Sequence, residues 1–206
     1  SAYKYAPAVE TNLINYLWPL LIVILSALLP GERLRWFHVA GALLGLAGTV
    51  LIVSRGGSVR FEPEYAFGYG AALACALTWS SYSVVSRRFA EVPTGVVAGF
   101  CLATALLSLV AHHLFAVTVW PENGGQWLAV LGLGLMPVGA AFYVWDIGVK
   151  RGDIQLLGTA SYAAPLLSTL ILVAAGAADP GLHLAVAAVL ITAGAVLAAR
   201  AARRPP

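Results

Sequence analysis

Long apolar runs constrain the fold of this chain more than any other feature of its sequence. About 20 mostly apolar residues in a helix span a hydrocarbon core of about 30 Å, so each run counts as one membrane crossing. The strands of membrane barrels need only about 9–11 residues and alternate polar with apolar positions, which these runs do not. The sequence therefore predicts an all-α, polytopic membrane bundle. Seven runs are visible, at residues 9–29, 36–54, 66–86, 94–119, 127–149, 155–177 and 182–199.

The composition also places the chain in lipid. Hydrophobic residues make up 60% of its 206 residues and charged residues only 10%, whereas soluble proteins carry about 25% charged residues. Short connectors rich in Pro, Gly and charge separate the runs, so no soluble domain fits between them.

Cys75 and Cys101 fall in separate runs, without a histidine or second cysteine at metal-binding spacing. We therefore expect no disulfide framework, no metal site and no cofactor.

The basic residues gather at the ends of the runs and predict the orientation of the chain. If the segments alternate across the bilayer, one side receives nine Lys and Arg residues and the other three. Because basic residues are enriched on the cytoplasmic side, we expect the C-terminus in the cytoplasm. This distribution explains the net charge of +3 without a nucleic-acid partner. The nine are Arg33, Arg35, Arg87, Arg88, Lys150, Arg151, Arg200, Arg203 and Arg204, and the three are Lys4, Arg55 and Arg60.

The chain contains an internal repeat, in which residues 3–54 match residues 149–200 at an offset of 146. The most informative matches lie in a shared Tyr-x-x-Pro-Leu-Leu motif, because it pairs rarer residues. With Lys4 expected outside and Lys150 inside, the two copies cross the membrane in opposite directions. Inverted repeats of this kind are common in secondary transporters. Matched pairs include Tyr16 with Tyr162, Pro19 with Pro165, Leu20 and Leu21 with Leu166 and Leu167, Leu44 with Leu190, and Gly48 with Gly194.

The repeat predicts more helices than the seven runs. The second copy begins near Ala66, and the same offset places the start of the first copy about 80 residues before Ser1. Three further helices would fill that stretch. We therefore expect a protein of ten crossings, arranged as two inverted halves of five helices, with its N-terminus also in the cytoplasm.

Several stretches resemble the EamA-type proteins of the drug/metabolite transporter superfamily. Residues 8–21, AVETNLINYLWPLL, followed by the Gly-Glu-Arg-Leu of residues 31–34, resemble the fourth-helix signature of that family. Residues 15–19 (NYLWP), 141–148 (AFYVWDIG) and 161–165 (SYAAP) resemble its aromatic amino acid exporters. The resemblance covers essentially the whole chain.

This resemblance implies a fold, a function and a location. Residues 1–55 would form the end of the first EamA repeat, with helices four and five, and residues 66–200 the second repeat, with helices six to ten. Members of the family export amino acids, chiefly aromatic ones, and some toxic cations through a central cavity shared by the two halves. The chain would then be a multi-pass protein of the bacterial inner membrane.

Polar and aromatic residues recur at helical spacing on three of the runs. Such residues are costly in hydrocarbon and normally face a bundle interior or a wet cavity. We expect aromatic rings there to contact the apolar part of a small-molecule substrate, while hydroxyls and amides orient its charged ends. The candidate substrate-binding residues are Asn12, Asn15, Tyr16, Trp18 and Pro19 in the first run, Trp79 and Tyr82 in the third, and Ser161, Tyr162 and Pro165 in the sixth.

Helix packing is the alternative explanation for these stripes, since small and polar residues commonly join transmembrane helices. The repeat symmetry and the resemblance favour substrate binding. Pro19 and Pro165 occupy equivalent positions, and each removes a backbone donor and so bends or interrupts its helix. Gly41, Gly45 and Gly48 share one helix face that permits close helix approach, which we expect inside a monomer, with dimerisation as the alternative.

Acidic residues that would couple transport to protons are few. Glu10 lies near the outer end of its run, and Asp146 lies near the inner end of its own, where Lys150 at i+4 would pair with it. Both are candidates for coupling, and facilitated export without coupling remains open.

The sequence therefore predicts an exporter of aromatic and other amino acids that works by alternating access. An exporter of another metabolite or drug is the nearest alternative. A non-transporting structural or regulatory membrane module is an alternative from a different class. An intramembrane enzyme is not expected, because no Gly-x-Ser-x-Gly, His-Glu-x-x-His or comparable Ser/His pattern occurs.

Overall fold

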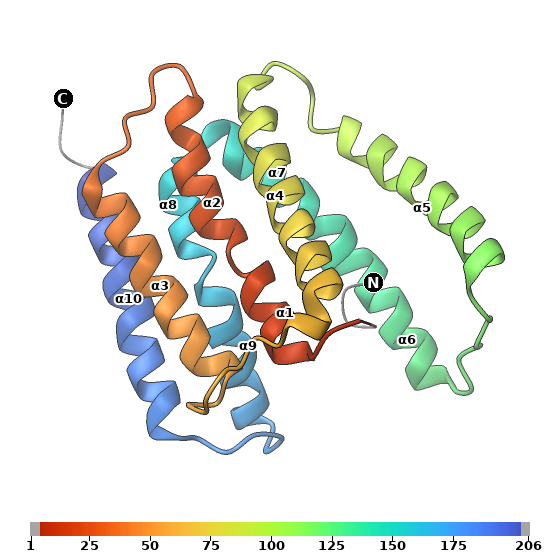
Figure 1. Ribbon diagram of the computed structural model, residues 1–206. Coiled ribbons are helices and arrows are strands. Elements are labelled where there is room, and N and C mark those ends of the chain that lie inside the picture. The colour runs from red at the N-terminus through yellow and green to blue at the C-terminus, as the bar shows by residue number, and fades with distance from the viewer. Residues whose placement is uncertain (1–4, 203–206) are drawn as a thin grey trace. The chain divides into compact units, whose positions relative to one another are not determined.

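A computed structural model describes residues 5–202, and that part of the chain consists of helices and their connections (Figure 1). Each predicted run corresponds to one helical stretch. The elements are α1 (Ala8–Asn15), α2 (Trp18–Leu25), η2 (Ser26–Leu28), α3 (Trp36–Val53), η3 (Pro63–Tyr65), α4 (Ala66–Arg88), α5 (Val96–Phe115), α6 (Gly124–Leu133), η4 (Gly134–Ala140), α7 (Ala141–Arg151), α8 (Ile154–Ala160), α9 (Ala163–Ala174) and α10 (Leu182–Ala202).

Six of the seven stretches are long and apolar enough to cross a membrane, within the described residues. The six are 8–28, 36–53, 96–115, 124–151, 154–174 and 182–200. The seventh, α4, has 23 residues and is long enough, but Trp, Tyr and Ser at residues 79–83 make its C-terminal half less apolar. Polar residues at this depth must face other helices or water rather than lipid. A crossing by α4 therefore stays a prediction.

The chain divides into two compact units. The first combines Ser1–Arg88 with Asp153–Pro206, and the second is Phe89–Gly152. The first unit holds the main hydrophobic core, in which Val23, Ala42, Tyr162 and Ala187 are fully buried. Most of the residues matched by the internal repeat lie in this first unit, while residues 149–152 belong to the second.

Helices α3 and α10 form the tightest pair of the first unit and lie side by side (Figure 1). Gly41 approaches Gly194 and Ala198, whereas Gly48 approaches Ala187 and Ile191. As the residue numbers rise along α3, those of the contacting residues on α10 fall, so the two helices run antiparallel. A Cβ atom added at Gly41 would lie 2.6 Å from the Gly194 carbonyl oxygen, so only glycine allows this approach. The predicted packing of this glycine face within the chain is confirmed.

Two membrane helices are interrupted at positions that correspond to within one residue and share the matched tyrosines Tyr16 and Tyr162. The break between α1 and α2 falls at residues 16–17, and the break between α8 and α9 falls at residues 161–162. A proline follows each break, Pro19 at the start of α2 and Pro165 near the start of α9. Proline lacks the amide hydrogen that would continue the helical ladder, and its ring crowds the preceding turn. Both breaks agree with the interruption that the sequence predicts.

The second unit contains α5 and the long stretch α6–η4–α7. Its middle, η4, is a π-helical segment containing Pro137. Around Pro137 the backbone therefore adopts wider, π-type hydrogen bonding, and the helix continues past this proline. Among the described residues of this unit, only Val97, Asp146 and Val149 are buried.

Candidate functional site

The break between α1 and α2 is held by two hydroxyl groups, one from α4 and one from the break between α8 and α9. Tyr162 Oη donates to the carbonyl of Tyr16 at 3.1 Å. Ser80 Oγ, on α4, donates to the carbonyl of Trp18 at 2.9 Å. Carbonyls near an interrupted helix need partners where water is scarce. Two hydrogen bonds from outside this helix therefore stabilise the break.

The bond between Tyr162 and Tyr16 joins equivalent residues of the two repeat copies, which stand 146 positions apart. Tyr162 is fully buried, and its ring lies against Gly45, where an added Cβ would fall 2.8 Å from the ring carbon Cγ. A side chain at position 45 would expel the ring. Gly45 thus makes the space that Tyr162 fills.

An aromatic group made by Trp18, Trp79 and Tyr82 lies between α2 and α4. The rings of Trp18 and Trp79 meet edge to face, with centroids 6.4 Å apart and an interplanar angle of 86°. The rings of Trp79 and Tyr82 are tilted by 31° with centroids 5.5 Å apart. All three side chains are half-buried. They therefore keep aromatic surface that a flat ligand can contact.

The structure brings some predicted residues together and separates others. Trp18, Trp79 and Tyr82 form one group, and Tyr16 with Tyr162 forms the bond described above. Asn12 and Asn15 are half-buried on α1. Pro19 and Pro165 are buried at their breaks, which fits a role in shaping the backbone. Ser161 is half-buried, and its hydroxyl donates to the Leu157 carbonyl one turn earlier, at 2.8 Å.

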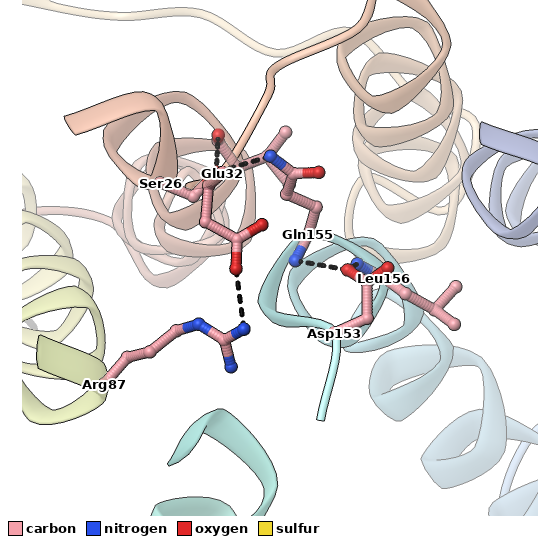
Figure 2. A network of polar contacts seen from close by, with 7 residues as sticks. Ser26, Glu32, Arg87, Asp153, Gln155 and Leu156 are labelled. Atoms are coloured by element: carbon pink, nitrogen blue, oxygen red, sulfur yellow. Dashed lines mark hydrogen bonds and ion pairs between the residues drawn. The ribbon is translucent and has the colours of Figure 1, made fainter. Parts of the chain in front are cut away.

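A polar network at the far end of α2 was not predicted. Gln155 Nε2 donates to Ser26 Oγ at 3.1 Å, and both side chains are buried. Asp153 caps α8 by accepting from the amides of Gln155 and Leu156 at 3.0 and 2.9 Å. Figure 2 shows these side chains around the start of α8. A glutamine inside an apolar run is a signal that sequence reasoning could have used.

An ion pair lies in the same network. Arg87 Nη2 donates to Glu32 Oε1 at 2.6 Å, with side chains 24% and 21% exposed. The pair ties the connector after α2 to the C-terminal end of α4 (Figure 2).

The sequence analysis also did not identify Ser80, because this residue lies one position away from the predicted stripe on α4.

The second unit contains a buried charged pair. Asp146 Oδ2 accepts from Lys150 Nζ at 2.7 Å and from Thr94 Oγ1 at 2.8 Å. Lys150 also donates to the Val92 carbonyl at 2.9 Å. The predicted pairing of Asp146 with Lys150 is confirmed. Glu10, the other acidic candidate, is half-buried in the first turn of α1, where the helix dipole stabilises a negatively charged carboxylate.

The groups gathered here are of types suited to binding a small molecule. Aromatic rings and backbone carbonyls next to two helix breaks offer apolar contact, hydrogen bonds and oriented dipoles. Among residues 5–202, no cluster of three His, Cys, Asp or Glu side chains could hold a metal ion.

Comparison with known proteins identifies relatives along nearly the whole chain. The model of the EamA-like transporter family matches residues 1–54 and 66–200. The chain is 63% identical over 205 residues to the aromatic amino acid exporter YddG of Ancylobacter novellus, an alignment that covers 99% of this chain and 71% of that protein. It is 26% identical over 176 residues to the aromatic amino acid exporter YddG of Escherichia coli (strain K12), covering 82% of this chain and 59% of that protein.

A solved structure has the same fold. A crystal structure of a protein with 63% sequence identity matches with a TM-score of 0.93, covering 97% of this chain and 71% of that chain.

Proposed function

The chain belongs to the EamA-like transporter family, and on that premise we propose that it exports aromatic and other amino acids from the cytoplasm by alternating access. The observation that carries this proposal is the 63% identity over 205 residues to an aromatic amino acid exporter. Export of this kind changes no covalent bond. It needs a binding surface and two gates that open in turn.

The aromatic group of Trp18, Trp79 and Tyr82 is the proposed contact for the side chain of the substrate. An edge-to-face ring pair leaves flat faces on which a further aromatic ring can stack. Tyr16, Asn12 and Asn15 lie on the neighbouring helix α1 and its end, and supply hydroxyl and amide groups for the charged ends of an amino acid. The two helix breaks add backbone dipoles that favour charged groups.

The proposed architecture is a ten-helix inverted repeat in the bacterial inner membrane, with the C-terminus in the cytoplasm. Residues 1–55 would be the end of the first repeat and residues 66–200 the second. The antiparallel course of α3 and α10 supports this proposal, as do α8 and α10, which begin 146 residues after α1 and α3. The unequal distribution of basic residues supports the orientation.

Glu10 and Asp146 are the proposed candidates for proton coupling. The pair with Lys150 favours a structural role for Asp146, because removing one partner of a buried pair leaves the other charge uncompensated. Coupling would make substrate accumulation depend on a pH gradient. The variants Glu10→Gln and Asp146→Asn, each measured with and without that gradient, tell which carboxylate is needed.

The decisive experiment is transport in proteoliposomes, using the protein as its host produces it. We expect labelled tryptophan to be transported and to be competed by phenylalanine and tyrosine, but not by unrelated metabolites. Trp79→Ala should reduce the rate by about threefold to tenfold, since an aromatic contact contributes about 0.5–1.5 kcal/mol. Leu77→Ala is the matched control, because it removes an exposed side chain from the same helix. Indifference to all aromatic amino acids would contradict the proposed substrate.

A non-transporting membrane module is the alternative from another class. Single cysteines at Tyr16, Trp79 and Ser161 distinguish the two, because a transporter must wet its binding surface. Water-soluble thiol reagents should label all three. Complete protection of all three positions would favour the module.

A further inference from the structure

The hydroxyl group of Ser80 joins the two helices that carry the aromatic group. Ser80 is 0% exposed on α4. Its one hydroxyl proton is shared between the Trp18 carbonyl on α2, at 2.9 Å, and the Ala76 carbonyl of its own helix, at 2.6 Å. Thr78, two residues earlier on α4, is exposed and donates to the Ala74 carbonyl at 2.7 Å. Both hydroxyls thus bond within α4, and Ser80 adds a bond to α2.

Ser80 lies in the contact between α4 and α2. Gly68, Ala72 and Ala76 precede it at intervals of four residues and are also buried. Small residues at this spacing let a neighbouring helix approach closely. Ser80 is the only one of these four residues with a side-chain donor. Because a hydroxyl in such a dry contact is costly without a partner, the close approach of α2 and the bond to Trp18 support each other.

The bond reaches the backbone at the point where the helix is interrupted. Trp18 begins α2 directly after the break, and Pro19 follows it. Proline has no amide hydrogen, so the hydrogen-bond ladder of the helix is incomplete here. Ser80 therefore supplies, from α4, a constraint on the Trp18 backbone that the interrupted helix lacks. In the second repeat copy Ala164 is equivalent to Trp18 and Pro165 to Pro19, so the other break carries no ring at this position.

The same bond connects the two segments that carry the rings. Ser80 directly follows Trp79 in the sequence, so its bond to Trp18 lies within one residue of each ring. The two rings meet edge to face with centroids 6.4 Å apart, and the Tyr82 ring extends the group along α4. The energy of an aromatic pair depends on the direction of the rings as well as their distance. A shift of the Trp18 backbone would therefore change the ring face that a flat ligand contacts.

We propose that Ser80 is a positioning residue that makes the aromatic group selective for flat side chains, because its hydroxyl holds the Trp18 backbone. The proposal rests on the proposed transport function and adds a residue that acts through Trp18. Without the hydroxyl, the rings of Trp18 and Trp79 lose their edge-to-face arrangement. An aromatic substrate then loses its stacking surface. An aliphatic substrate loses little, since apolar contact in general has no preferred direction.

The arrangement of the rings can be measured without any substrate. Two indole rings this close couple their electronic transitions, which gives a pair of bands of opposite sign in the circular dichroism of the protein. Subtracting the spectrum of Trp18→Phe isolates the band pair that involves Trp18. We expect Ser80→Ala to reduce the amplitude of this band pair by at least about half, because the preferred geometry of the rings is lost.

Transport in proteoliposomes tests the selectivity. For Ser80→Ala, kcat/KM for tryptophan should fall by about threefold to tenfold relative to kcat/KM for leucine. Ser80→Cys keeps the size of the side chain and is a weaker donor, so it should lie between the unaltered protein and Ser80→Ala in both measurements. Thr78→Ala is the matched control, because it removes a hydroxyl of α4 that bonds within its own helix. It should change neither the band pair nor the ratio.

An unchanged band pair in Ser80→Ala would overturn the proposal. So would an unchanged ratio of tryptophan to leucine transport, whatever the absolute rates, because Ser80 would then support only the packing of the helices. If the unaltered protein carries no aromatic amino acid, the proposed function fails, and the band pair still decides whether Ser80 orients Trp18. The two proposals therefore fail separately.

Discussion

The two interrupted helices, α1–α2 and α8–α9, carry the same Tyr-x-x-Pro-Leu-Leu motif and break at its tyrosine, yet their tyrosines have different surroundings. Tyr162 is fully buried and Tyr16 is half-buried. Tyr162 fills the space left by Gly45. The residue equivalent to Gly45 is Ile191, which lies against Gly48. The motif thus marks both breaks, and the space at Gly45 accounts for the deep burial of Tyr162.

The largest effect is expected from closing the space at Gly45. In Gly45→Val the added carbons would overlap the Tyr162 ring, so we expect a loss of stability at the upper end of about 1–3 kcal/mol. The thermal unfolding midpoint in detergent should fall accordingly. Gly99→Val is the matched control, because a Cβ at this position of α5 has nothing within 4 Å. Equal destabilisation by both variants would show that helix propensity, and not the ring, is responsible.

A smaller effect should separate the two tyrosines directly. Tyr162→Phe keeps the ring but removes the donor to the Tyr16 carbonyl, which should cost about 1 kcal/mol. Tyr16→Phe should cost less, because the hydroxyl of a half-buried side chain exchanges more readily with water. Chemical or thermal unfolding of the two variants side by side gives the difference. If Tyr16→Phe proved the more costly, the burial difference would not reflect the strength of these contacts.

The smallest effect is expected at the ion pair of Glu32 with Arg87. The residue equivalent to Glu32 in the second copy is Ala178, so this pair is a further difference between the copies. Its side chains are partly exposed, and such pairs contribute about 0–1 kcal/mol. Glu32→Gln should therefore lower the unfolding midpoint only slightly, and less so at high salt. A large loss of stability that salt does not change would mean that Glu32 acts through packing.

The sequence was sufficient for the features that depend on period and repetition. Runs of apolar residues predicted the seven helical stretches, because membrane thickness sets their length. The glycine face of α3 and the two proline breaks followed from steric rules that act within one helix. The pairing of Asp146 with Lys150 followed from their spacing on one helix face.

Contacts between distant helices were beyond sequence reasoning. The bond from Ser80 to Trp18 depends on how α4 is rotated against α2, and a rotation of one residue replaces Ser80 by a neighbour. The bond from Gln155 to Ser26 joins positions that the repeat does not match to each other. The sequence analysis also treated α4 like the other crossings. It counted the Trp, Tyr and Ser residues of α4 as a binding stripe and did not consider that they lower the hydropathy of this helix.

The glycine crossing of α3 and α10 has an evolutionary consequence. Gly41 meets Gly194 as Ala187 meets Gly48, and the repeat exchanges these two contacts. A surface that pairs with its own copy is the isologous interface of a two-fold dimer. Joining both subunits in one polypeptide frees each to mutate alone, which a homodimer cannot do. Gly45 and its equivalent Ile191 differ in this way, because Gly45 lies against the Tyr162 ring and Ile191 against Gly48.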